Sequence, residues 1–321
     1  MQIDNKQFTN AKVIRKNLIC IPFAFNEKSN TGVNVRGDAF SVYLKNACVA
    51  LCSAKYFNPE CDVALVTNIS SNQLPNEYVD ILEKYEVLIL EVQFDEFVFA
   101  DNYLWSLAFY KLCILKHFSD SDYQNVCYMD TDVYVQNNLE PLWEECKQNI
   151  LLYDINHGLQ VDDYRSICEE FESFFGEKKY LTHFGGEFFA SSVENAKIFV
   201  EILNKVYAQM LRDNFVTSKG DEFLISISAS YLRDRIKNAS GYIYRFWTAP
   251  GFRLVSTSYE NNPVLILHLP NEKNRGMIKL FDVYIKKGII PKNQKVWKIC
   301  RLSSLSILDR IKKSIKKLII N

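Results

Sequence analysis

The segment VCYMDTDVYV, Val126–Val135, carries the strongest fold signal in the chain. Four apolar residues, Val126–Met129, predict a buried strand that runs directly into Asp130 and Asp132. Because side chains alternate along an extended chain, we expect both carboxylates to project to the same side. Ligands bind outside the carboxyl ends of strands in α/β sheets, and Mg²⁺ and Mn²⁺ prefer oxygen ligands. The segment therefore predicts a divalent-cation site, although two surface aspartates in a turn would give the same pattern.

Apolar runs and helical patterns alternate before this segment. The runs predict strands at Leu18–Ala24, Asp62–Thr67 and Val87–Val92. The helical patterns are Ala39–Phe57, Asn76–Tyr85 and Asp101–Phe118, the last with Asp101 or Asn102 as N-cap. This alternation predicts an α/β fold with a mainly parallel sheet covered on both faces.

The pattern is less regular after residue 150. We expect strands at Ile150–Tyr153, Phe184–Ala190 and Val264–Leu269, and helices at Tyr164–Phe175, Ala196–Asn214 and Glu222–Leu232. No repeat or Pro/Ser-rich linker interrupts the sequence. We therefore expect one catalytic unit over residues 1–300 and an appendage over residues 301–321.

Composition narrows the class of protein. Lysine plus arginine number 38 and aspartate plus glutamate number 38, so the net charge is zero, which argues against a general nucleic-acid binder. No segment resembles a signal peptide, and no apolar run has the length of a membrane span. The nine cysteines have no C-x-x-C spacing, and most lie in apolar runs. These features predict a cytoplasmic protein with reduced cysteines.

The longer segment YMDTDVYVQNNLEPLWE resembles the D-x-D segment of glycosyltransferases with the GT-A fold. It is similar above all to the family-8-like enzymes, including bacterial galactosyl- and glucosyltransferases that build surface glycans. The matching residues after the D-x-D are Leu139, Pro141, Leu142 and Trp143. The resemblance implies that Asp130 and Asp132 hold Mn²⁺ or Mg²⁺, and that these two residues and Thr131 contact a nucleoside diphosphate sugar, of which a UDP-sugar is the expected kind.

Three further segments resemble parts of the same enzymes. Lys111, in WSLAFYKLCIL, stands where a basic residue faces the donor, although it would also suit the solvent side of an amphipathic helix. Gly186, in FGGEFFAS, matches a strand that lines the sugar pocket, although a plain bulge would also use glycine. Gly185 departs from the family's Asn or Ser, and Glu187 is atypical. Asp221 and Glu222, in KGDEF, match the acidic segment at the reaction centre, although both residues would also cap a helix.

The late segment VLILHLPNEKNRG resembles the family's C-terminal motif. The resemblance implies that His268 completes the metal site and that Lys273 and Arg275 contact the diphosphate. Spacing and order differ from the usual H-x-x-G-x-x-K-P-W, and a lone histidine is more often structural. An imidazole beside carboxylates would favour Mn²⁺. Asn68, after the second strand, is a candidate contact to the nucleotide.

The C-terminal stretch RLSSLSILDRIKKSIKKLIIN predicts a basic amphipathic helix. Its apolar residues recur three and four apart, and lysines occupy the other side. We expect it to bind an anionic membrane surface, peripherally and on the cytoplasmic side. A helix docked on the body of the same protein would show the same pattern.

These features predict a metal-dependent transferase that moves a hexose from a nucleotide sugar to a glycan or lipid-linked acceptor, with retention implied by the resemblance. Two alternatives remain. One is a phosphohydrolase of the haloacid dehalogenase type, which also places D-x-D after a strand. The other is a non-catalytic relative that binds sugar nucleotides.

Overall fold

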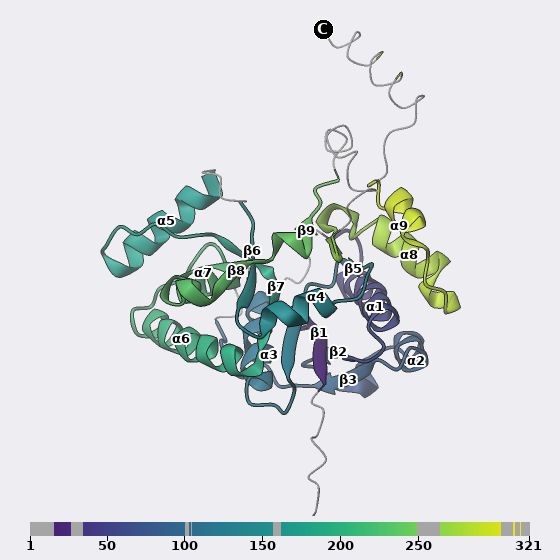
Figure 1. The fold of residues 1–321 in the computed structure, drawn as a ribbon, viewed down its shortest axis with the longest axis horizontal. Coiled ribbons are helices and arrows are strands. Elements are labelled where there is room, and N and C mark those ends of the chain that lie inside the picture. Colours follow the sequence, from purple (N-terminus) through teal and green to yellow (C-terminus); the bar gives the residue numbers. More distant parts are fainter. Residues whose placement is uncertain are drawn as a thin grey trace, which may run out of the picture.

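A mixed sheet of seven strands forms the centre of the structure (Figure 1). The computed structural model describes residues 16–26, 35–99, 103, 105–156, 162–248, 264–302, 311 and 315. In these residues the strand order is β3-β2-β1-β4-β7-β6-β8. The strands are β1 (Asn17–Phe23), β2 (Asp62–Thr67), β3 (Leu88–Glu91), β4 (Asn125–Met129), β6 (Ile150–Asp154), β7 (Phe184–Ser192) and β8 (Ile236–Asn238).

Strand β7 is the one strand of this sheet that runs against the others. It pairs antiparallel with β4 and with β6, whereas β1, β2, β3 and β4 pair in parallel, and so do β6 and β8. The start of β7 therefore lies beside the carboxyl end of β4. The predicted mainly parallel sheet is confirmed.

Helices cover both faces of the sheet. They are α1 (Ala39–Phe57), α2 (Asn76–Lys84), α3 (Tyr110–Phe118), α4 (Glu140–Cys146), α5 (Asp162–Phe175), α6 (Val193–Arg212), α7 (Asp221–Tyr231), α8 (Gly276–Val283) and α9 (Asn293–Ile299). Short 3₁₀ turns occur at Ser71–Gln73, Ser106–Phe109, Arg233–Arg235, Ala239–Gly241, Pro270–Glu272 and Ile285–Lys287.

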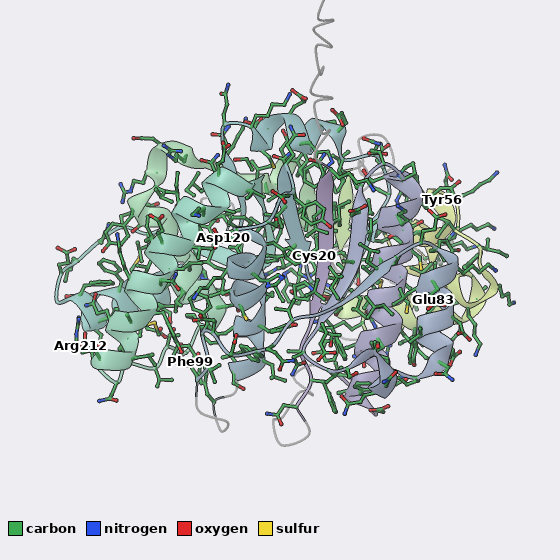
Figure 2. The ribbon with its side chains drawn as sticks, turned by 90° about the horizontal axis from the view of Figure 1, so that it is seen from below. Cys20, Tyr56, Glu83, Phe99, Asp120 and Arg212 are labelled. Atoms are coloured by element: carbon green, nitrogen blue, oxygen red, sulfur yellow. The ribbon has the colours of Figure 1, made fainter. Side chains whose placement is uncertain are left out.

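The period of two along β1 explains this layering. Leu18 and Cys20 belong to the core cluster that contains α3 and α6, whereas Ile19 and Ile21 belong to the cluster that contains α1. All four side chains are buried, so β1 is a continuous apolar run, as expected for a strand covered on both faces. Figure 2 shows Cys20 near the middle of the molecule, between the helices of the two flanks.

A second sheet of three short strands lies beside the main one and was not predicted. Its order is β5 (Val133–Val135), β10 (Ile266–His268) and β9 (Ile243–Arg245). Each strand has three residues, which is too short to show a period in the sequence. We expected the late strand to be longer, over Val264–Leu269.

The predicted helix Asp101–Phe118 is wrong at its start. A 3₁₀ turn at Ser106–Phe109 precedes α3, and Phe109 at the N-cap of α3 supplies no capping side chain. Phe109 and Tyr110 are buried at this junction, so apolar packing rather than a polar cap accompanies the start of the helix. The predicted caps Asp101 and Asn102 lie outside the described residues.

The remaining sequence expectations concern cysteines, membrane spans and the tail. All nine cysteines are described and none forms a disulfide. No described helix has the length and apolar character to cross a bilayer. Within the predicted amphipathic tail, only Ile311 and Ile315 are described beyond Leu302, and each is about half exposed, at 50% and 51%. The rest of that prediction lies outside the described residues.

Candidate active site

The segment between β4 and β5 is held by backbone hydrogen bonds on both sides. The N–H of Asp130 donates to the carbonyl of Glu187, at 2.9 Å, because β7 starts beside the end of β4. The N–H of Leu269 donates to the carbonyl of Asp132, also at 2.9 Å. The acidic segment is thereby fixed between the large and the small sheet.

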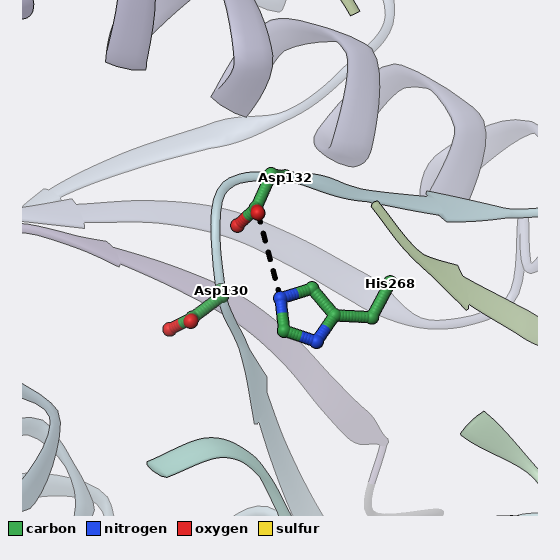
Figure 3. A group of neighbouring side chains, drawn as sticks. All are labelled: Asp130, Asp132 and His268. Carbon is green, nitrogen blue, oxygen red and sulfur yellow. Dashed lines mark ion pairs between the residues drawn. The ribbon is translucent and has the colours of Figure 1, made fainter. Parts of the chain in front are cut away.

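The small sheet brings His268 to the acidic segment. In its register, His268 lies opposite Val133 of β5 on one side and opposite Arg245 of β9 on the other. One ligand atom from each of Asp130, Asp132 and His268 lies within 4.8 Å of the others (Figure 3). His268 Nε2 is 3.4 Å from Asp132 Oδ2. The predicted triad is thus brought together from segments more than 130 residues apart in the chain.

The environment of Asp132 fits a metal ligand. Its side chain is fully buried, and neither carboxylate oxygen accepts a hydrogen bond from the described residues. A buried carboxylate is costly unless a cation compensates it, and Lys273 Nζ lies 3.4 Å from Oδ2. Two carboxylates and one imidazole are a donor set that suits Mn²⁺ and also allows Mg²⁺.

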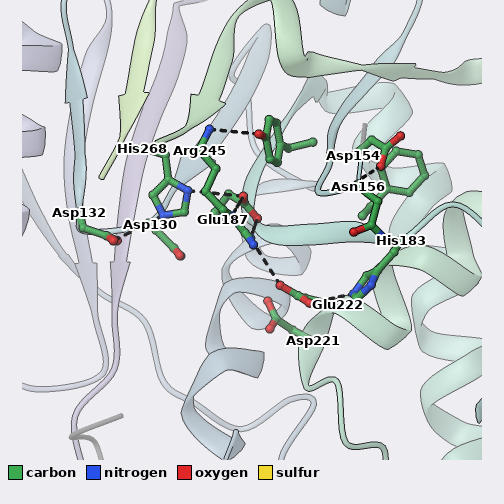
Figure 4. Close-up of polar contacts among 12 residues, drawn as sticks. Asp130, Asp132, Asp154, Asn156, His183, Glu187, Asp221, Glu222, Arg245 and His268 are labelled. Carbon is green, nitrogen blue, oxygen red and sulfur yellow. Dashed lines mark hydrogen bonds and ion pairs between the residues drawn. The ribbon is translucent and has the colours of Figure 1, made fainter. Parts of the chain in front are cut away.

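A carboxylate supports His268 from its other side. His268 Nδ1 is 3.4 Å from Glu187 Oε1, which is itself buried (Figure 4). Arg245 binds both oxygens of Glu187, with Nε 2.7 Å from Oε1 and Nη2 2.7 Å from Oε2. Histidine ligands of metals usually donate their second N–H to such a partner, which orients the ring. Glu187 is therefore placed to orient His268, a role that the sequence did not reveal.

The network continues from Arg245 to the start of α7. Arg245 Nη2 lies 3.7 Å from Glu222 Oε1, and Glu222 Oε2 lies 2.8 Å from His183 Nε2 (Figure 4). Glu222 is the more open of the two predicted catalytic carboxylates, because its side chain is 26% exposed against 6% for Asp221. The chain of contacts thus joins His268, through Glu187 and Arg245, to Glu222 of the KGDEF segment.

Lys111 of α3 connects the same two regions by a second route. Its Nζ is 3.3 Å from Asp130 Oδ1 and 2.9 Å from Asp221 Oδ2. Gly186 allows this arrangement, because a Cβ at that position would come within 2.0 Å of Asp221 Oδ2 and 2.9 Å of Lys111 Nζ. Lys111 is therefore an internal ion-pair partner and not a solvent-facing lysine, and a side chain at Gly186 would force Asp221 or Lys111 to move.

The charges of this network leave room for a divalent cation. Five carboxylates and three permanent cations take part, so the network carries two excess negative charges when His268 is neutral, as it must be to bind a metal. The carboxylates are those of Asp130, Asp132, Glu187, Asp221 and Glu222, and the cations are Lys111, Arg245 and Lys273. A bound divalent cation would balance this excess.

Burial and ion pairing pull the pKa values of these groups in opposite directions. Burial acts to raise the pKa of Asp132, but Lys273 and His268 outweigh it and hold that pKa below its usual range. Burial raises the pKa of Asp221 to about 6, against the opposing effect of Lys111. Burial acts to lower the pKa of His268, but the carboxylates of Asp132 and Glu187 raise it to about 9. Strongly shifted groups gathered at strand ends are typical of functional sites.

A cavity of about 220 Å³ opens beside the acidic segment. Its polar wall contains Lys111, Asp130, Thr131, Asp132 and Lys273. Its apolar wall is formed by the end of β1, the first turns of α1 and the 3₁₀ turn before α3, with aromatic rings from Phe25, Phe40, Tyr43, Trp105 and Tyr110. The cavity therefore combines charged groups with the aromatic surface that a nucleobase could stack on.

Other predicted residues have different surroundings. The side chain of Asn68 holds the backbone of Phe25, accepting from its N–H at 2.8 Å and donating to its carbonyl at 3.0 Å. A direct contact of Asn68 with a nucleotide stays a prediction. Arg275 is exposed at the start of α8 and does not line the cavity beside Asp130. Gly276 begins α8, and its N–H donates to Glu272.

The sequence did not identify Glu187, Arg245 and His183 as members of the site. One feature of the sequence could have pointed to Arg245, because it is the one charged residue within the aromatic stretch YIYRFW. A charged residue between apolar strand residues is buried only when it is paired. Its partner could not be found from spacing, because Glu187 lies 58 residues away.

No family model matches the chain, and the search of curated proteins gave no match. Among solved structures, the chain is similar to the crystal structure of mouse xyloside xylosyltransferase 1 in its apo form. The TM-score is 0.49 and the sequence identity 13%, over 79% of this chain and 96% of that chain. At this TM-score and identity, the likeness does not indicate the function of the chain.

Proposed function

We propose that this protein is a metal-dependent glycosyltransferase with a GT-A fold of the family-8-like kind. It would move a hexose from a nucleoside diphosphate sugar, a UDP-sugar first of all, to a glycan or lipid-linked acceptor. The observation that carries this proposal is the convergence of Asp130, Asp132 and His268 at the carboxyl end of β4, beside a cavity with aromatic and cationic walls.

The residues divide into those that hold a cation and those that hold the donor. Asp130, Asp132 and His268 would bind Mn²⁺, or Mg²⁺, which when bound supplies Lewis-acid stabilisation of charge on the diphosphate leaving group. Lys273 and Lys111 both line the cavity, so they would add positive charge where the diphosphate lies. Thr131 and the aromatic wall would contact the nucleoside.

Two carboxylates would act near the transferred sugar. Glu222 is partly open and is oriented by His183 and Arg245, which supports it as the carboxylate that meets the sugar. The carboxylate of Asp221 packs against Gly186 of β7 and pairs with Lys111. It would therefore position that lysine and the strand proposed to line the sugar pocket. Retention of anomeric configuration is part of the proposal, and NMR of the first product anomer would test it.

The proposal is tested by a donor-hydrolysis screen with and without Mn²⁺. The wild-type protein should release nucleotide from one class of sugar donor only when the metal is added. Asp130→Ala and Asp132→Ala should abolish this turnover while leaving the circular dichroism spectrum unchanged. Asp122→Ala, which removes an exposed aspartate outside the site, is the matched control and should behave as wild type.

Three results would reject the proposal or a part of it. Unchanged turnover in either metal-ligand variant rejects the assignment of the cation site. Metal-dependent hydrolysis of an aryl phosphate, with no activity on sugar donors, favours the phosphohydrolase. Metal-dependent nucleotide binding without turnover on any donor favours a non-catalytic relative.

A further inference from the structure

A second cavity, of about 920 Å³, adjoins the proposed donor site and has an unusual concentration of positive charge. It is lined by the first turns of α1 and α8, which lie side by side (Figure 1), and by residues that follow β9 and α9. Lys273 lines both cavities, so the two spaces share one wall. A molecule held in the second cavity would therefore lie next to the donor diphosphate.

Five basic side chains line this cavity against one acidic side chain. The basic residues are Arg36, Lys45, Lys273, Arg275 and Arg301, and the acidic one is Asp38. The whole chain has no net charge, so this concentration is local. It makes the cavity attractive to anions.

Three of the cations are already neutralised, and two are not. Lys45 pairs with Asp282 at 3.1 Å, Lys273 with Asp132 at 3.4 Å, and Arg301 with Glu272. Among the described residues, the guanidinium groups of Arg36 and Arg275 have no anionic partner, and both residues are exposed.

The one acidic residue of the lining is engaged elsewhere, so its charge offsets only part of theirs. The carboxylate of Asp38 caps α1, accepting from the N–H groups of Phe40 at 3.2 Å and Ser41 at 3.3 Å. Two unpaired guanidinium groups match the charge and the oxygen geometry of a phosphate or a diphosphate.

An aromatic side chain completes the lining. Trp247 is 52% exposed and forms part of the cavity wall. An exposed indole in a cavity wall offers a large, rigid apolar face to a ligand. Its flat face suits the C–H face of a sugar ring, whereas the arginines suit a phosphate. The combination points to one ligand that carries both groups.

We propose that this cavity binds the acceptor and that the acceptor carries a phosphate or diphosphate group next to its sugar. Arg36 and Arg275 would bind the phosphate, Trp247 would contact the sugar, and Lys273 would lie between acceptor and donor. This inference rests on the proposed glycosyltransferase function. It also changes the predicted role of Arg275, from a contact to the donor diphosphate to a contact to the acceptor.

The test is calorimetry with the full chain in the presence of saturating UDP and Mn²⁺, so that the donor site is occupied. Glucose 1-phosphate is the soluble probe, and a polyprenyl phosphate in neutral detergent micelles is the lipid probe. The wild-type protein should bind at least one probe. Arg36→Gln/Arg275→Gln should weaken that binding by about tenfold or more, because two charge-assisted contacts are lost.

Lys279→Gln/Lys295→Gln is the matched control, because it removes the same net charge from exposed lysines outside the cavity. This variant should bind the probe as the wild type does. Binding of both probes assigns recognition to the phosphate group itself, and binding of the lipid probe alone assigns a lipid-linked acceptor.

Three results would overturn the inference: no binding of either probe by the wild type, equal loss in both double variants, or, in a parallel titration without UDP, probe binding that UDP abolishes. The third result would mean that the cavity belongs to the donor. The wild-type donor-hydrolysis screen separates this inference from the function on which it rests. Hydrolysis without probe binding rejects only the acceptor site, whereas absence of Mn²⁺-dependent hydrolysis rejects the proposed function.

Discussion

At the scale of single residues, the site depends on Glu187, which lies between His268 and Arg245. Its carboxylate is 3.4 Å from His268 Nδ1 and forms a two-pronged ion pair with Arg245. Because Nε2, the nitrogen of His268 beside Asp132, is the one proposed to bind the metal, Glu187 would orient the ring without contacting the metal. It is a positioning residue for the proposed cation site.

We predict that Glu187→Gln weakens Mn²⁺ binding by about 10–100-fold, as expected when the partner of a metal-bound histidine is lost. Calorimetry or the electron paramagnetic resonance signal of free Mn²⁺ would measure the change. Glu222→Gln is the control, since it also removes a carboxylate beside Arg245 but leaves His268 untouched. Equal losses of affinity in the two variants would argue against the positioning role.

Asp221 should make stability depend on pH. Burial raises its pKa from 3.8 to about 6, so between these values the folded protein binds more protons than the unfolded chain. The free energy of unfolding therefore falls as pH rises through this window. Above pH 6 the protein has lost all the stability that ionisation of the buried Asp221 carboxyl costs. Lys111 reduces this cost but does not remove it.

We predict that Asp221→Asn stabilises the EDTA-treated protein at pH 8 by on the order of 2–3 kcal/mol, since asparagine does not ionise. The advantage should disappear below about pH 4, where aspartate is protonated in both states. Urea unfolding at a series of pH values would measure it. A difference that stays constant across the series would contradict the assigned pKa.

At the scale of elements, α1 supports the chain just after the proposed metal ligands Asp130 and Asp132. Ser53 accepts from the N–H of Val135 in β5, at 3.1 Å. Asn58, the C-cap of α1, accepts from the N–H of Leu139 at 2.7 Å and donates to the carbonyl of Ala54 at 3.0 Å. The helix end therefore satisfies buried backbone groups just after β5, which fixes the exit of the chain from the site.

We predict that Asn58→Ala lowers the free energy of unfolding by about 1–3 kcal/mol, because it leaves the buried N–H of Leu139 without a partner. Chemical denaturation would measure the loss. Asn137→Ala, on the exposed side of the same turn, should cost much less. Similar losses in the two variants would show that the side chain of Asn58 does not anchor this segment.

At the scale of the whole molecule, the proposed cation site connects distant parts of the chain. Asp130 and Asp132 follow a strand of the large sheet, whereas His268 ends a strand of the small one. The two sheets therefore meet at the site. A ligand that binds all three residues stabilises only the folded arrangement, because the unfolded chain does not bring them together.

We predict that Mn²⁺ at about 100 times its dissociation constant stabilises the protein by about 2.7 kcal/mol, with a matching rise in Tm. Differential scanning fluorimetry with Mn²⁺ and then with excess EDTA would measure the shift and its reversal. Asp132→Asn should remove the shift. A shift that survives in this variant would place the cation elsewhere in the protein.

The sequence by itself determined the local features of this protein. Continuous apolar runs predicted β1, β2 and β4, and the helical pattern predicted α1 with its observed bounds, because burial on both faces of a strand and period along a helix are properties of neighbouring residues. The acidic pair at the end of β4 was visible for the same reason.

The resemblance to known enzymes pointed to His268 as a partner of that pair, but only the tertiary structure decided how His268 reaches it and which further residues, Glu187 and Arg245, join. The antiparallel return of β7 brings Glu187 to Asp130, and the short strands β9 and β10 set Arg245 and His268 in one row beside Val133. Strands of three residues have no period to detect, and strand pairing between remote segments leaves no spacing in the sequence. The ion-pair network and both cavities therefore follow from packing, where a buried charge is stable only beside its partner.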